Sequence, residues 1–158
     1  MKLVFDWLTR VALILAGTSL LIIALVQAWQ VYARYVLNDS PGWTEPVALL
    51  LMNTAMMCGA AVGVRRHQHF SFSLMLDAAG PLLQRALRVL SAALIAAIGA
   101  ALAWGGAQLL QDDWGTSMAG AAIPEGLRYA PLILGGALIC LFALEQLADL
   151  WRGRPVES

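Results

Sequence analysis

The stretch VALILAGTSLLIIALVQAWQVYA, residues 11–33, contains no charged side chain. An α-helix rises about 1.5 Å per residue, so roughly 20 residues cross the ~30 Å hydrocarbon core of a bilayer, and this stretch is long enough. Backbone groups cannot remain unpaired in lipid, so the stretch is predicted to be a membrane-spanning helix. Three further apolar windows of similar length are 46–64, 89–111 and 129–150. The sequence therefore predicts an all-α membrane protein with four transmembrane helices.

The composition agrees with a membrane domain. Of the 158 residues, 60% are hydrophobic and 13% are charged, whereas about 25% of the residues of a soluble domain are charged. The formal net charge is zero, which gives no reason to expect a nucleic-acid partner. We find no linker, low-complexity tract or internal repeat, and we expect one membrane domain over residues 1–158.

Lysine and arginine residues predict the orientation of the chain. The N-terminal flank, the middle loop after the second window and the C-terminal tail hold Lys2, Arg10, Arg65, Arg66, Arg85, Arg88, Arg152 and Arg154. On the other side lie only Arg34 and Arg128. By the positive-inside rule, both termini and the middle loop are expected in the cytoplasm. The connection at 34–46 is then exterior, and periplasmic in a Gram-negative cell.

Two segments have alternative interpretations. Val26-Gln27-Ala28 resembles a signal-peptidase site, but the apolar run exceeds the ~7–15 residues of a signal-peptide core, so an uncleaved anchor is expected. In the middle loop, residues 67–84, apolar and polar residues alternate as in a strand. Because an isolated strand would lack a pairing partner, we expect a helix in the membrane interface that ends at Pro81.

Small residues repeat every four positions in three of the windows. These residues are Ala55, Gly59 and Gly63 in the second window, Ala92, Ala96 and Ala100 beside Gly99, Ala103 and Ala107 in the third, and Gly136 and Cys140 in the fourth. Such stripes let helix backbones approach closely. They predict either packing within a four-helix bundle or docking of a partner.

The spans lack the groups that chemistry in a membrane requires. His67 and His69 lie in the middle loop, whereas a haem between helices needs histidine ligands at membrane depth. Cys58 and Cys140 have no neighbouring cysteine and are expected to be small core residues. No charge lies near the middle of a window, although ion pathways normally carry one. We therefore expect no enzyme activity, no cofactor and no metal site.

Polar residues inside the windows are expected to be satisfied by neighbouring groups. Asn53 and Thr54 lie near mid-depth of the second window and are expected to bond an adjacent helix. Glu145 and Asp149 lie four residues apart, so they share one helix face near the cytoplasmic end. Carboxylates at the end of a helix oppose its dipole, so these two are expected to pair with Arg152 or with basic residues of the middle loop.

The exterior connection, with the sequence RYVLNDSPGWTEP, concentrates polar and aromatic residues. The rings expected at the membrane surface are those of Tyr32, Tyr35 and Trp43. Thr44 or Asn38 can cap a turn, and Pro46 suits the first turn of the second helix. Glu45 in that turn suits the helix dipole. We predict that Arg34 and Glu45 pair, either with each other or with a partner chain.

Two patterns carry a resemblance to a known family. One is Arg34-Tyr35-Val36-Leu37-Asn38, followed by Trp43-Thr44-Glu45 at the start of the second window. The other is Gly59-Ala60-Ala61-Val62-Gly63-Val64-Arg65-Arg66, followed by His69 and an apolar stretch ending near Asp77, with Ile123-Pro124 before the last window as a weaker third element. The chain thereby resembles the small transmembrane subunit of TRAP transporters, the tripartite ATP-independent periplasmic carriers. It departs from the family pattern at Pro46, where a second acid is frequent, and at the His-Gln-His of 67–69, where a glycine is common.

The resemblance implies a bacterial inner-membrane protein that braces a large multi-span permease. A periplasmic binding protein would deliver an organic acid, and an ion gradient would drive its uptake. The candidate interface or structural residues are Arg34, Asn38, Trp43, Glu45, Gly59, Gly63, Arg65 and His69. The alternative is a self-sufficient four-helix exporter that acts as a dimer, but such exporters normally need an acidic residue well inside a span, and Glu45 lies at the edge of one.

Overall fold

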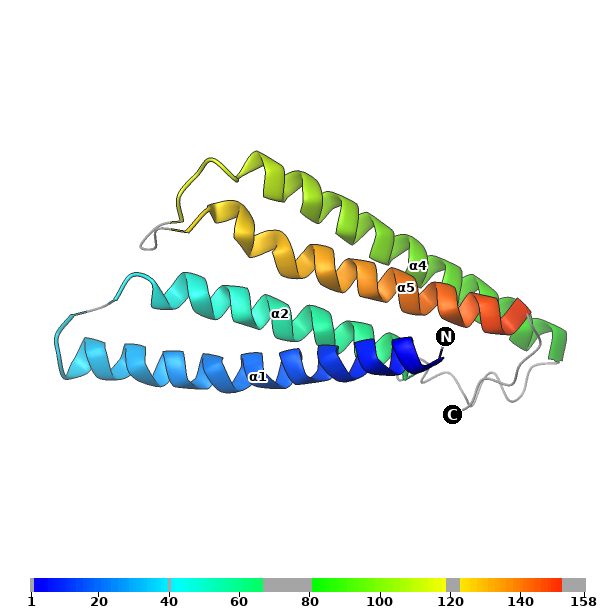
Figure 1. Cartoon of the computed structure of the whole chain (residues 1–158), viewed down its shortest axis with the longest axis horizontal. Coiled ribbons are helices and arrows are strands. Elements are labelled where there is room, and N and C mark those ends of the chain that lie inside the picture. Colours follow the sequence, from blue (N-terminus) through cyan, green and yellow to red (C-terminus); the bar gives the residue numbers. More distant parts are fainter. Residues whose placement is uncertain (1, 40, 67–80, 119–122, 152–158) are drawn as a thin grey trace.

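A computed structural model describes residues 2–39, 41–66, 81–118 and 123–151, and all regular elements in these ranges are helical. The elements are α1 (Lys2–Tyr35), α2 (Thr44–Arg65), α4 (Pro81–Asp112), the short 3-10 helix η1 (Glu125–Tyr129) and α5 (Ala130–Trp151), as Figure 1 shows. The four α-helices are long and apolar enough to cross a membrane. The prediction of an all-α protein with four transmembrane helices is therefore confirmed.

The first and third helices extend beyond their apolar windows. α1 begins at Lys2 and continues through Asp6 and Arg10 before it reaches the charge-free stretch. α4 begins at Pro81, the residue at which the predicted interfacial helix was expected to end. Proline suits that position because the first N–H groups of a helix have no partner within it. The predicted interfacial helix and the candidate residue His69 otherwise lie outside the described residues.

The chain folds into two helical hairpins of the same orientation. α1 runs along the molecule and α2 returns, and α4 and α5 repeat this course (Figure 1). In each hairpin a long helix, of 34 residues in α1 and 32 in α4, precedes one of 22 residues. We call the end with the start of α1 and the end of α2 the basic end, and the other the acidic end.

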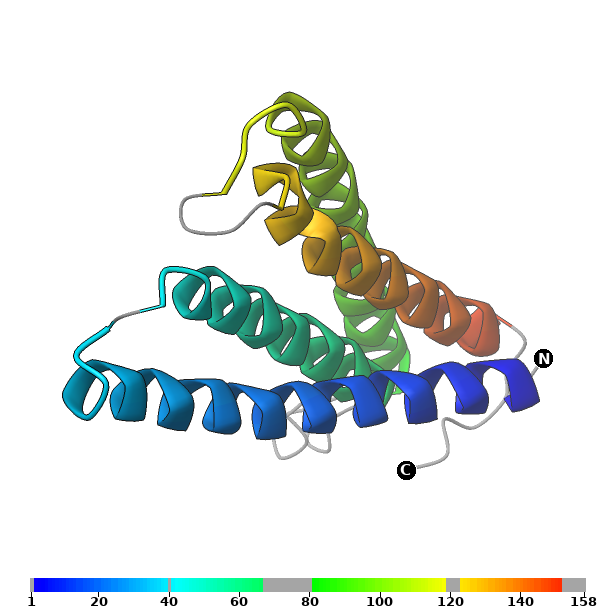
Figure 2. The ribbon, with the colours of Figure 1, turned by 60° about the vertical axis from the view of Figure 1, so that its left-hand side comes forward.

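The two shorter helices form the centre of the molecule. α2 and α5 run parallel to each other and are in contact, while α1 packs mainly on α2 and α4 on α5. Figure 2 shows α1 and α4 diverging toward the acidic end. Only 11% of the apolar window of α1 and 17% of that of α4 is buried, against 33% in the other two spans. The long outer helices thus present most of their apolar surface to lipid or to another protein.

Glycines allow the close crossing of α4 and α5. A Cβ atom added at Gly99 would lie 2.7 Å from the backbone nitrogen of Cys140, and one at Gly136 would lie 2.7 Å from that of Ala103. Ala92 and Ala96 on the same side of α4 are also buried. These small residues of α4 therefore pack inside the chain, whereas Ala100 of the same predicted stripe is exposed.

The small residues of α2 divide between inside and outside. Ala61, Val62, Gly63 and Val64 are all buried, because α1 and α5 converge on α2 near the basic end. Gly59 is exposed, and a Cβ atom there would meet nothing within 4 Å. The two glycines of this window thus have different surroundings, and Gly59 takes no part in packing among the described residues.

Candidate functional site

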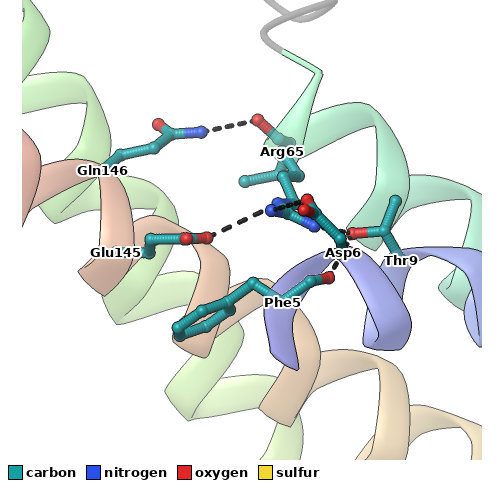
Figure 3. Close-up of polar contacts among 7 residues, drawn as sticks. Phe5, Asp6, Thr9, Arg65, Glu145 and Gln146 are labelled. Carbon is teal, nitrogen blue, oxygen red and sulfur yellow. Dashed lines mark hydrogen bonds and ion pairs between the residues drawn. The ribbon is translucent and has the colours of Figure 1, made fainter. Parts of the chain in front are cut away.

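Among the residues that the structure describes, the largest cluster of polar contacts lies at the basic end, around the guanidinium of Arg65 (Figure 3). Arg65 is the last residue of α2. Its Nη2 donates to Oδ1 of Asp6 at 2.6 Å, and its Nη1 donates to Oγ1 of Thr9 at 2.5 Å. Its Nε lies 3.5 Å from Oε2 of Glu145 on α5. One side chain therefore joins three helices, α1, α2 and α5.

Aromatic rings surround the same guanidinium. Its central carbon lies 5.9 Å from the ring centre of Phe5 and 5.6 Å from that of Phe142, which is fully buried. A second polar link is close by, since Nε2 of Gln146 donates to the backbone oxygen of Val64 at 2.6 Å. A delocalised cation packs well against rings while it donates in its own plane. The arrangement holds the N-terminal turns of α1 and the last turns of α5 against the end of α2.

Burial decides which of these contacts matter most. The side chains of Arg65 and Glu145 are each 18% exposed, whereas that of Asp6 is 61% exposed. An exposed pair is screened by water and contributes little. Thr9 donates its own hydrogen to the backbone oxygen of Phe5 at 2.8 Å, so its oxygen is oriented to accept from Arg65. The half-buried contacts to Thr9 and Glu145 therefore contribute most to the cluster.

The sequence predicted part of this cluster. Glu145 was expected to pair with Arg152 or with a basic residue between the second and third windows, where Arg65 was counted. The contact with Arg65 agrees with the second option, although Arg65 is the last residue of α2 and not part of a loop. The contributions of Asp6 and Thr9 were not predicted. Their spacing of three residues, which places both on one face of a helix, was the available signal.

The first connection at the acidic end is shaped by Asn38. Its φ of 55° is in the left-handed region, which asparagine tolerates better than most residues other than glycine. The turn lets the N–H of Asp39 donate to the carbonyl of Ala33 at 3.1 Å, so a carbonyl in the last turn of α1 gains a partner. The expectation that Asn38 supports a turn agrees with this geometry.

The start of α2 differs in part from the prediction. The N-cap residue is Trp43, which makes no side-chain capping bond, and Thr44 is already helical. Thr44, which was expected as one of two residues that can cap a turn, donates its hydroxyl back to the carbonyl of Pro41 at 2.8 Å and makes no capping bond to α2. Glu45 and Pro46 do lie in the first turn, as expected.

Arg34 and Glu45 do not form an ion pair within the described part of the chain. Both are exposed, at the end of α1 and the start of α2 respectively. The first option of the prediction, a direct pair, is therefore absent from this structure. Pairing of either residue with a partner chain stays a prediction.

A further hydrogen bond joins the two hairpins near the acidic end. Nδ2 of Asn53 donates to the backbone oxygen of Arg128 at 3.3 Å, as expected for a bond to a neighbouring element. Thr54 differs, because its hydroxyl donates to Leu50 of its own helix at 2.8 Å. Arg128 pairs with Glu125 at 2.6 Å in the turn that opens η1. The two hairpins are thus linked by polar contacts near both ends. Asn53 and Arg128 link them near the acidic end, and the Arg65 cluster links them at the basic end.

Comparisons with known proteins agree with the features described so far. A profile of the family described as "Tripartite ATP-independent periplasmic transporters, DctQ component" matches residues 23–153. The sialic acid TRAP transporter small permease protein SiaQ of Vibrio cholerae serotype O1 is 33% identical over 52 residues. That alignment covers 33% of this chain and 30% of the relative, so it spans less than a third of SiaQ.

Proposed function

Because the chain belongs to the DctQ family, the small membrane component of tripartite ATP-independent periplasmic (TRAP) transporters, we propose that it braces a large multi-span permease of such a carrier. The family resides in the inner membrane, and the four apolar helices fit a multi-pass protein there. A periplasmic binding protein would deliver the substrate, and an ion gradient would drive its uptake. The relative SiaQ is named for sialic acid, which supports an organic acid as the substrate class.

The observation that carries the proposal is the contrast between the ends and the middle of the helices. Charged side chains gather at both ends, whereas the windows 11–33, 46–64 and 89–111 hold none. Ion-coupled transport normally uses ionisable or strongly polar groups at membrane depth. Two long outer helices with mostly exposed apolar surface supply instead a frame against which another membrane protein can pack. The transport site is therefore expected on the permease.

The same contrast supports one orientation of the chain in the membrane. The basic end holds Arg10, Arg65, Arg66, Arg85 and Arg88, and the acidic end holds Asp39, Glu45, Asp112, Asp113 and Glu125. The positive-inside rule then supports a cytoplasmic basic end and a periplasmic acidic end. The side chains Arg34, Trp43 and Glu45 would lie on the periplasmic side, where they can meet the permease.

Co-expression and transport measurements test the proposal. The chain should copurify with the large TRAP permease of the same host when the two are co-expressed, and uptake of the organic acid should require the chain, the permease and the binding protein together. The control is uptake with the chain omitted, which should fall to background. Transport by the isolated chain in liposomes would refute the bracing role and favour the exporter.

A further inference from the structure

One face of α1 intersperses small, polar and charged residues among bulky apolar ones along its apolar length. Its members are Leu13, Gly17, Leu20, Ala24, Gln27, Val31 and Arg34, and we call this face the α1 seam. Steps of four and three residues alternate along it, as in a helix that packs lengthwise on another. Every member is exposed, so α2 does not cover the seam.

A neighbouring exposed face of α1 has the same spacing and a different composition. Its members are Ile14, Thr18, Leu21, Leu25, Ala28 and Tyr32, and we call it the lipid face. It is mostly bulky and apolar, and it ends in a tyrosine, the kind of residue that settles at a membrane surface. The hydroxyl of Thr18 donates to the carbonyl of Ile14 at 2.8 Å, so its polar group is satisfied. Lipid can cover this face without leaving a polar group unpaired.

Lipid cannot cover the α1 seam in the same way. Gln27 lies five positions from the middle of the window 11–33, or about 8 Å at 1.5 Å per residue, which is inside the ~15 Å half-thickness of the hydrocarbon core. The described residues give its side-chain amide no hydrogen bond. An amide exposed to hydrocarbon without a partner is unfavourable. The seam therefore needs a neighbour that offers hydrogen-bonding groups at this depth.

Two further residues of the α1 seam indicate which groups that neighbour carries and how closely it can approach. Arg34 carries an exposed cation at the acidic end of the seam and has no ion pair among the described residues, so it fits a carboxylate. Gly17 lies nearer the basic end, where a Cβ atom would meet nothing within 4 Å, so a helix can approach the backbone closely.

We propose that the α1 seam is the docking surface for one transmembrane helix of the permease, which presents a hydrogen-bonding side chain beside Gln27 and a carboxylate beside Arg34. The unpaired amide of Gln27 at membrane depth favours a protein helix over lipid, and the exposed cation of Arg34 calls for a negative group on that helix. The proposal rests on the proposed function, because the permease is the expected membrane partner. It adds which face of which helix is covered and what the partner carries there.

A matched pair of substitutions tests the proposal in the complex purified from membranes. Gly17→Leu places bulk on the seam, whereas Thr18→Leu places similar bulk on the lipid face at the same depth. Gly17→Leu should lower the permease recovered with the chain by about tenfold, equivalent to ~1.4 kcal/mol. Thr18→Leu should leave recovery within about twofold of the unsubstituted chain, because lipid accommodates an apolar side chain.

Photocrosslinking tests the same surface without added bulk. A photoreactive amino acid at Leu20, on the seam, should crosslink to the permease, and the permease helix that contains the crosslinked residue should carry the carboxylate proposed for Arg34. The same group at Ile22, exposed on another face of α1, should not. The crosslinking variants also decide the question if Gly17→Leu fails to accumulate in the membrane.

The outcomes separate this proposal from the proposed function. If the complex forms but Gly17→Leu binds normally and Leu20 crosslinks to lipid or to a second copy of the chain, the seam is wrong and the bracing role stands. If the unsubstituted chain does not copurify with the permease, both proposals fall.

Discussion

Substitution of Arg65 by alanine should loosen the basic end by an amount that the contacts of the guanidinium define. The half-buried bond to Thr9 involves a charged donor and contributes about 1.5 kcal/mol. The contact with Glu145 at 3.5 Å contributes about 1 kcal/mol, and the exposed pair with Asp6 at most ~0.5 kcal/mol. Packing against the two phenylalanine rings adds about 0.5 kcal/mol. The expected loss is therefore about 3 kcal/mol, or roughly two decades in the unfolding constant.

The assay measures the unfolding constant of the chain in its purified complex with the permease. Unfolding is carried out reversibly in mixed micelles of detergent and dodecyl sulfate. Arg66→Ala is the matched control, because Arg66 is adjacent, exposed and in none of the described side-chain contacts. Arg65→Lys should recover about a third of the loss, since an ammonium keeps the charge and lacks the planar fork of donors. Equal losses for Arg65→Ala and Arg66→Ala would refute the reasoning.

Three more predictions follow from the described geometry. Gly99→Ala should destabilise the chain by about 1–3 kcal/mol, because its methyl group would meet backbone atoms of α5. Gly105→Ala, in open surroundings on the same helix, should be neutral or stabilising by up to ~1 kcal/mol, and equal effects in an unfolding assay would contradict the close crossing. Asn38→Gly should change stability little, whereas Asn38→Val should cost about 1–2 kcal/mol because of the left-handed backbone, and equal stability of the two variants would show that the turn does not form. In a chain lacking Cys58 and Cys140, an impermeant thiol reagent should label Ser117→Cys in intact cells and Arg66→Cys only after lysis, and the reverse pattern would invert the proposed orientation.

The spans could be predicted from the sequence because the bilayer imposes a simple requirement, an apolar length without charge. The windows 11–33, 46–64 and 89–111 each lie inside one helix, and 129–150 extends one residue into η1. The helix ends could not be predicted in this way. α1 continues through Asp6 because helical hydrogen bonding does not require apolar side chains, and the cluster around Arg65 gives that carboxylate a partner.

Which of the small residues contact another helix could not be predicted from the sequence. Gly59 and Gly99 are the same residue type in similar apolar helices. A Cβ atom added at Gly99 would meet backbone atoms of α5, whereas one at Gly59 would meet no atom of the described residues within 4 Å. The difference depends on which helices are neighbours, and a four-residue repeat carries no information on that. The partners of Arg65 were likewise only half predictable, since Asp6 and Glu145 approach it from helices far apart in the sequence.

The like orientation of the two hairpins has a consequence for how the protein can be made. Each hairpin, residues 2–66 and 81–151, crosses the bilayer twice and brings its two ends back to the same side. If the gene were divided between these ranges, no new chain terminus would have to cross the membrane. The halves would meet through α2 and α5, along the helix contact and the links from Arg65 to Glu145 and from Asn53 to Arg128. Two separately translated fragments should therefore insert independently and reassemble side by side.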